Sequence, residues 1–251
     1  GVPLTKKVSF WNFIVSRTYR LFPLHIFMLL ILILIETSKY LVYQNGFVFN
    51  NVPFSHATAM TTILPNLLLL QSWLPTELHA TWNLPSWSIS IEYYLYIIFF
   101  MTSYIKGYLK YLLWLSIVML SLFLLKDNNS YINRGLSSFF IGTITYLFYQ
   151  KITFSFNKHL FSLFEIILLV ATVVIISSSV ENKFLYINII FSLIVLVFAY
   201  EKGVISKLLL NKIPLYLGKI SYSIYMVHFV IIQIFIAFTI LLNKYYNLDL
   251  F

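Results

Sequence analysis

The sequence predicts an all-α fold, a polytopic bundle of transmembrane helices. Of the 251 residues, 60% are apolar and 10% are charged, whereas an ordinary soluble domain is about 25% charged. Long runs that carry almost no charge, such as HIFMLLILILI and VIIQIFIAFTILL, recur along the whole chain, and such runs span a bilayer as helices. The alternating segments of about ten residues that are typical of transmembrane β-barrels are absent.

Composition also excludes several functional classes. The chain has no cysteine, which excludes disulfides, thiolate metal sites and a cysteine nucleophile. It has seven glycines and neither a GxGxxG nor a GK[ST] motif, so nothing indicates a soluble nucleotide-binding fold. We expect no metal site and no permanently bound cofactor. The net charge of +9 is better explained by basic cytoplasmic loops and anionic lipid headgroups than by nucleic acid, so the lipid bilayer is the expected partner.

Hydrophobic runs define the expected elements in chain order. The second run is short and is bracketed by Pro65 and Pro75, so we expect it to lie on or dip into the bilayer. The other seven are expected to cross, with an outer segment over about residues 42–86. The eight runs cover residues 21–41, 60–74, 87–105, 109–125, 135–150, 160–180, 184–200 and 215–242.

The positions of the basic residues predict the orientation. With seven crossings, twelve basic residues share one face and five lie on the other, and the richer face is cytoplasmic by the positive-inside rule. Residues 1–20 are therefore expected in the cytoplasm. The richer face holds Lys6, Lys7, Arg17, Arg20, Lys106, Lys110, Lys151, Lys158, Lys202, Lys207, Lys212 and Lys219. The other face holds Lys39, Lys126, Arg134, Lys183 and Lys244.

Both ends of the chain suggest a fragment. Gly1 opens a basic segment without a methionine, and Phe251 follows shortly after a hydrophobic span. No repeat and no second soluble domain is visible, so we expect residues 1–251 to form part of a single membrane domain.

Glu92 is the most informative residue in the chain. A glutamate within lipid costs roughly a few kcal/mol and marks a functional site by default. Ser88, Glu92 and Tyr96 follow an i, i+4, i+8 pattern, so they share one helix face that should look into the bundle. The spacing places Glu92 about a turn and a half below the outer surface. The alternative is a structural carboxylate, and Arg134 is then its expected partner.

Arg17 and Arg20 stand i, i+3 at the cytoplasmic entry of the first span. Guanidinium groups bind phosphates through paired N–H donors, so Arg17 and Arg20 are a candidate site for a phosphorylated cytoplasmic ligand. Ordinary anchoring of positive charge at the membrane surface explains the spacing equally well.

Two further stripes and a tryptophan-rich segment carry weaker signals. Tyr225 and His228 follow Gly218 and Ser221 on one face, and His228 is more simply a hydrogen-bonded packing histidine. Arg134 begins a stripe of small residues (Ser138, Gly142 and Thr145) that also permits close helix packing. The outer segment combines Trp73, Trp82 and Trp87 with Asn83, Glu77 and His79, which suits either membrane-interface anchoring or stacking on sugars. Glu36, His56 and His159 are expected at loop ends, and Glu165 is expected to snorkel to the cytoplasm.

These residues also carry a resemblance. FIVSRTYRLFPLH, NLPSWSISIEYYLYIIFF, INRGLSSFFIGTITY and LGKISYSIYMVH occur in the order and spacing of the acyltransferase 3 family, over nearly the whole chain. The resemblance implies a bundle of about ten helices in the bacterial inner membrane. It also implies transfer of acyl groups, most often acetyl, from cytoplasmic acetyl-CoA or another acyl-CoA to O-antigen, capsule or exopolysaccharide. In that family Arg17 and Arg20 lie on the donor side, and Ser88 and Glu92 belong to the functional core.

The chain departs from the family at both ends. The first two helices, which carry the histidine proposed as catalytic, and the last helix are missing. The fragment itself is therefore expected to be inactive, and neither His79 nor His228 is taken as the general base.

The residues and the resemblance lead to one mechanism and two alternatives. Arg17 and Arg20 would hold the donor phosphates, a base would take the acceptor proton, and polar donors would stabilise the oxyanion. A transporter of glycans or lipid-linked sugars, or a non-enzymatic assembly subunit, would also use intramembrane charge and basic loops. The expected acceptor contacts are Trp82, Asn83, Trp87, Arg134, Tyr225 and His228.

Overall fold

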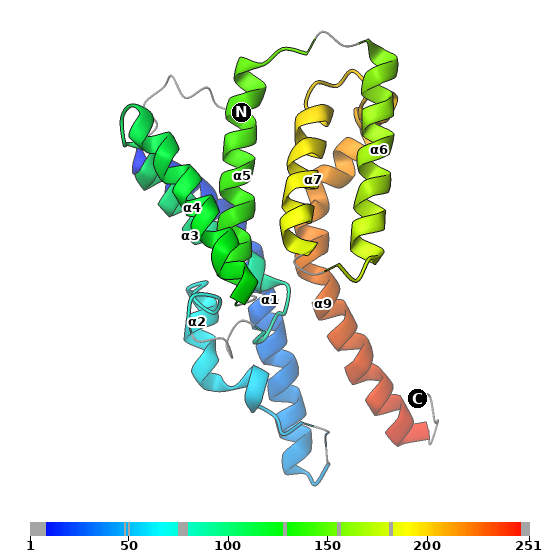
Figure 1. Ribbon diagram of the computed structural model, residues 1–251. Coiled ribbons are helices and arrows are strands. Elements are labelled where there is room, and N and C mark those ends of the chain that lie inside the picture. Colours follow the sequence, from blue (N-terminus) through cyan, green and yellow to red (C-terminus); the bar gives the residue numbers. More distant parts are fainter. Residues whose placement is uncertain are drawn as a thin grey trace. The chain divides into compact units, whose positions relative to one another are not determined.

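All regular structure in the described residues is helical (Figure 1), which confirms the predicted fold class. The computed structural model describes residues 9–47, 49, 51–74, 80–127, 130–154, 157–180 and 183–246. Seven residues named in the sequence analysis lie outside these ranges: Gly1, Lys6, Lys7, Pro75, Glu77, His79 and Phe251.

The long helices coincide with the hydrophobic runs that were expected to cross. They are α1 (Phe10–Gln44), α3 (Ser86–Ser103), α4 (Tyr108–Asp127), α5 (Tyr131–Lys151), α6 (Lys158–Ser177), α7 (Lys183–Phe198) and α9 (Lys212–Tyr246). Among the residues described, α1, α4, α6 and α9 contain the four stretches that are long and apolar enough to cross a membrane. The chain is thus a multi-pass membrane protein, and the figure of seven crossings stays a prediction.

Residues 60–74 form no long helix, as their prolines predicted. They contain the turn η2 (Met60–Thr62) and the five-residue helix α2 (Ile63–Leu67), preceded by η1 (His56–Thr58). Five residues rise about 7.5 Å, far less than the bilayer core of about 30 Å. This stretch therefore does not cross as a helix.

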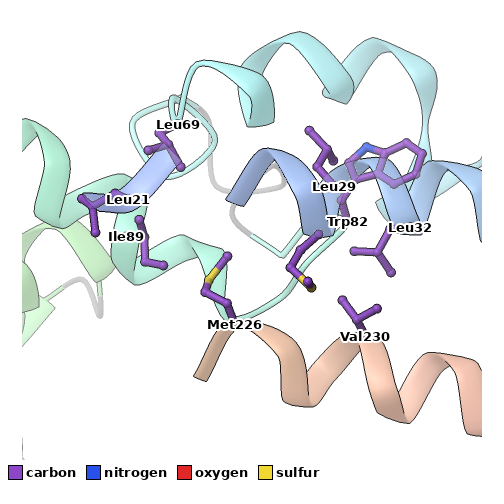
Figure 2. Close-up of a cluster of buried hydrophobic side chains, with 9 residues drawn as sticks. Leu21, Leu29, Leu32, Leu69, Trp82, Ile89, Met226 and Val230 are labelled. Carbon is purple, nitrogen blue, oxygen red and sulfur yellow. The ribbon is translucent and has the colours of Figure 1, made fainter. Parts of the chain in front are cut away.

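The chain divides into two compact units. The first comprises Gly1–Ile97 and Ile220–Phe251, and the second comprises Ile98–Lys219. A hydrophobic cluster in the first unit joins α1, α3, α9 and the residues that lead into α3 (Figure 2). Its buried members are Leu21, Met28, Leu29, Leu32, Leu69, Trp82, Ile89, Met226 and Val230.

The residues before α3 fold into the first unit instead of lying at its surface. We call residues 62–74 and 80–85 the inner segment. His25 Nε2 on α1 donates to the Asn66 carbonyl (2.7 Å), and Asn83 Nδ2 donates to the Met226 carbonyl on α9 (3.2 Å). Gln71 donates to Ser86 Oγ (3.0 Å). Because Ser86 is fully buried, α3 begins inside the unit.

In the second unit, α4 and α5 form an antiparallel hairpin, α6 and α7 lie side by side, and α7 also packs on α5 (Figure 1). Asn188 on α7 binds α5, accepting from Ser138 Oγ (2.7 Å) and donating to Ser137 Oγ (3.1 Å). A Cβ atom on Gly142 would meet nothing within 4 Å. Close helix packing therefore does not explain that glycine.

Two glutamates are structural in ways that the sequence did not predict. Glu165 is fully buried and does not snorkel, since its carboxylate accepts from the backbone of Ile205 (2.9 Å) and Ser206 (3.2 Å). These amides open α8 (Val204–Leu209), where a carboxylate is favoured by the exposed N–H groups. Glu36 is a buried α1 residue, not a loop end, and it accepts from Phe54 N (3.0 Å) and Thr58 Oγ1 (2.9 Å).

Replacing Glu165 by glutamine is expected to lower the free energy of unfolding by about 2 kcal/mol or more, because an amide NH₂ would face a backbone N–H donor. Thermal unfolding in detergent measures the loss. Glu201→Gln is the matched control, since Glu201 is exposed, and it should change little. Equal stability of the two variants would contradict this role.

The orientation is testable with single cysteines, since the chain has none. Asn45 and Ser179 lie on the face expected outside, Lys106 and Asn211 lie on the face expected inside, and all four are exposed. In intact cells an impermeant thiol reagent should label cysteines at 45 and 179 only. Labelling at 106 and 211 alone would reverse the assignment.

Candidate functional site

Arg17, Glu92 and Tyr96 meet within the first unit. The Arg17 guanidinium carbon lies 4.8 Å from the centre of the Tyr96 ring and 5.3 Å from that of Phe13. The Tyr96 hydroxyl donates to Glu92 Oε1, one helical turn away on α3. Two stripes that the sequence predicted separately thus form one polar cluster on α1 and α3.

Arg20 and Tyr222 complete this cluster. Arg20 follows Arg17 by three residues on α1, so the two lie on neighbouring positions of one helix face. The Tyr222 hydroxyl donates to the Leu21 carbonyl on α1 (2.6 Å), which holds α9 against the site. We refer to Arg17, Arg20, Glu92, Tyr96 and Tyr222 as the arginine–glutamate cluster.

The cluster leaves donors available for an anion. Arg20 is exposed, and the buried Arg17 Nε has no hydrogen-bond partner among the described residues. Both guanidinium groups could therefore direct N–H donors at a bound phosphate or carboxylate.

Glu92 lies close to Arg17, whereas the sequence analysis placed the two near opposite membrane surfaces. The depth estimate assumed that α3 starts at the outer surface, but α3 starts at the buried Ser86. Its antiparallel course beside α1 then brings Glu92 to the level of the arginines. The expected separation between Arg17 on the donor side and Glu92 near the outer face is wrong.

Ser88, Tyr225 and His228 form a second group in the same unit. Ser88 Oγ lies 3.0 Å from the Tyr225 hydroxyl, which donates to the Pro85 carbonyl (3.0 Å). His228 Nδ1 donates to the Tyr225 carbonyl on its own helix (2.6 Å), and the His228 side chain is exposed. Ser88 and Tyr225 are thus direct neighbours, although they are far apart in the sequence.

The tryptophans of the outer segment have different surroundings. Trp82 is 3% exposed, and its Nε1 donates to Thr62 Oγ1 (2.9 Å). Trp87 is half-buried, and Asn83 is 1% exposed. Protein covers the Trp82 ring, so in this structure neither of its faces is open to a sugar. The roles of these residues in substrate binding stay predictions.

Arg134 belongs to the second unit. Its guanidinium carbon lies 3.7 Å from the centre of the Phe184 ring and 5.2 Å from that of Tyr131, so the charge stacks on aromatic faces. The proposed pair with Glu92 would join the two units and stays a prediction.

Buried acceptors surround the inner segment, and of these the sequence predicted Asn83 as a contact but not His25, Asn66 or Gln71. Four of their atoms have no partner among the described residues: His25 Nδ1, Asn66 Oδ1, Gln71 Oε1 and Asn83 Oδ1. His25 donates through Nε2, so its Nδ1 is an acceptor in the neutral ring. Unsatisfied buried groups are rare and call for a partner such as water or a ligand. The sequence did contain a signal for these acceptors, since Asn66 and Gln71 are polar residues within the apolar run 60–74.

Comparison with known proteins adds one finding. A family model described as an acyltransferase domain matches residues 2–248, nearly the whole chain. No curated protein and no solved structure matches the chain.

Proposed function

We propose that this chain, which belongs to the acyltransferase 3 family, moves an acyl group from cytoplasmic acyl-CoA to a hydroxyl of an exported or cell-surface polysaccharide or glycolipid. Acetyl-CoA is the preferred donor in this proposal, and the bacterial inner membrane is the expected location. The observation that carries it is the arginine–glutamate cluster, because it combines phosphate-binding groups with a carboxylate in an otherwise apolar bundle.

The positive charge of Arg17 and Arg20 supports acyl-CoA as the proposed donor. Acyl-CoA carries phosphates, and guanidinium groups bind phosphates through paired N–H donors. Arg17 and Arg20 lie on the face expected in the cytoplasm, where acyl-CoA is made available. Before the donor binds, Glu92 offsets part of their charge, since an unbalanced charge in the membrane is costly.

The buried acceptors support the other substrate. Hydroxyl groups donate hydrogen bonds, and His25 Nδ1, Asn66 Oδ1 and Asn83 Oδ1 are acceptors without a partner among the described residues. Each of these residues is 1% exposed, so a water molecule would satisfy them in this structure, and a sugar hydroxyl would take its place once the surrounding protein opens.

The reaction itself balances without any further reagent. A base takes the proton of the acceptor hydroxyl, whose oxygen attacks the thioester carbonyl. The tetrahedral oxyanion then collapses and the carbon–sulfur bond breaks. The released thiolate takes up the proton and becomes free CoA. We propose that the base lies in helices before Arg17, as the family resemblance implies, and that Glu92, Ser88 and Tyr96 position the substrates and stabilise charge.

The test uses the full-length protein in nanodiscs with acetyl-CoA labelled in the acetyl group, plus polysaccharide from cells that lack the enzyme. Label should move to the polysaccharide as a base-labile ester, and only when acetyl-CoA is present. If the same protein in sealed vesicles moves polysaccharide across the membrane without any transfer of label, it is a transporter. Absence of both activities would favour a non-enzymatic subunit.

A further inference from the structure

A groove runs along the second unit, between α4, α5 and α7. Two adjoining cavities of about 340 Å³ and 360 Å³ share Leu115, Ile144 and Phe148. None of the lining residues is acidic, and most are aliphatic or aromatic. We call this feature the α4–α5–α7 groove. The residues that line it are Tyr111, Trp114, Leu115, Val118, Ile141, Ile144, Thr145, Leu147, Phe148, Lys151, Ser192, Leu193 and Leu196.

One end of the groove is basic. Lys151 lines the second cavity, and the Lys110 ammonium lies 5.0 Å from the centre of the Tyr111 ring and 5.5 Å from that of Trp114. The antiparallel hairpin brings these two lysines to the same end, since Lys110 opens α4 and Lys151 closes α5.

Neighbouring residues leave this end positive. The loop after α7 reaches it, because the Tyr149 hydroxyl donates to the Ala199 carbonyl (3.2 Å). That loop carries one acidic residue, Glu201, and one basic residue, Lys202, so it adds no net charge to this end. By the positive-inside rule, this is the cytoplasmic end.

The length of the groove matches one membrane leaflet. Its lining residues on α5 run from Ile141 to Lys151, a rise of about 15 Å. The hydrocarbon core is about 30 Å thick, so the groove spans about half of it. Trp114 and Tyr111 near the basic end suit the boundary between acyl chains and headgroups.

We propose that the α4–α5–α7 groove binds an anionic phospholipid of the cytoplasmic leaflet. One acyl chain lies along Leu115, Ile144 and Phe148, and the lipid phosphate sits between Lys110 and Lys151. Basic pockets between membrane helices on the cytoplasmic side bind anionic headgroups in this way. This site is independent of the proposed acyl transfer, since none of its residues belongs to the arginine–glutamate cluster.

The test titrates phosphatidylglycerol into the purified full-length protein in detergent and counts bound lipid by native mass spectrometry. Phosphatidylcholine is the comparison lipid. The Lys110→Gln/Lys151→Gln variant should bind phosphatidylglycerol about thirtyfold more weakly, the effect of two basic side chains near a headgroup. The matched control is Lys207→Gln/Lys212→Gln, which removes two exposed lysines outside the groove and should bind as the unmodified protein does.

A second variant tests whether the groove binds the acyl chain of the lipid. Ile144→Trp places a larger side chain where the two cavities meet and keeps both lysines, so binding of phosphatidylglycerol should weaken while the melting temperature stays within the range of the other variants. Glycerol 3-phosphate, a headgroup without chains, should not compete. Equal binding of the two lipids, unchanged binding by the lysine variant, or competition by glycerol 3-phosphate would each overturn the proposal. If Ile144→Trp does not fold, the lysine variant and the competition still decide it.

Discussion

Replacing Glu92 by glutamine is expected to leave a folded, inserted protein that transfers acyl groups about a hundredfold more slowly or worse, the scale of a lost acid–base or charge-stabilising group. The substitution keeps the shape of the side chain and still allows it to accept from Tyr96. What it removes is the negative charge beside Arg17 and Arg20. The measurement is acetylation of polysaccharide in cells that lack the native enzyme, with the amount of protein in the membrane as the control.

Two companion variants separate the roles of Glu92. Tyr96→Phe keeps the ring on Arg17 but removes the hydroxyl that donates to Glu92. If Glu92 acts only by accepting from Tyr96, Tyr96→Phe should lose activity whereas Glu92→Gln, which still accepts from Tyr96, should keep it. If Glu92 instead only balances Arg134, then Glu92→Gln/Arg134→Gln should recover stability that Glu92→Gln has lost. Near-normal acetylation by Glu92→Gln would make the residue a structural carboxylate.

Replacing Arg17 and Arg20 together by alanine is expected to raise the KM for acetyl-CoA by about a hundredfold, because each charge-assisted contact with a phosphate contributes about 1.5–3 kcal/mol. Lysine at both positions should restore only part of the loss, since an ammonium group lacks the planar fork. Initial rates over a range of acetyl-CoA concentrations measure this effect.

The matched control for the arginines is Lys212→Ala. Lys212 is exposed at the start of α9 and lies on the same expected cytoplasmic face, so its loss tests general positive charge. An unchanged KM in the double alanine variant, with normal insertion, would reduce Arg17 and Arg20 to membrane anchors.

Sequence predicted the helices well because each is a local property of the chain. The charge-free runs gave the fold class, and Pro65 within a short run marked a stretch that does not cross as a helix. The prediction that Glu92 and Tyr96 share a helix face is confirmed, since the Tyr96 hydroxyl reaches Glu92 across one turn. Periodicity fixes such neighbours within a helix.

What failed depends on contacts between distant residues. The closeness of Glu92 to Arg17 could not be read from α3 alone, because it follows from the packing of α3 on α1. Glu165 looked like a snorkelling residue since nothing near it in sequence shows that the start of α8 packs on it. Trp82 had the composition of a surface anchor, and only its packing shows that it is in the core.

The inner segment also fixes the order in which the protein can assemble as it is synthesised. Its bond from Asn83 to Met226 joins residues 143 positions apart, and the contact of Ser88 with Tyr225 joins residues 137 apart. At about 5–20 residues per second, a ribosome takes roughly 7–30 s to add the missing stretch. Arg17 can meet Tyr96 as soon as α3 is made, whereas Asn83 waits for α9. The nascent chain can therefore form the contact between Arg17 and Tyr96 well before α9 closes the inner segment and brings Tyr222 to the cluster.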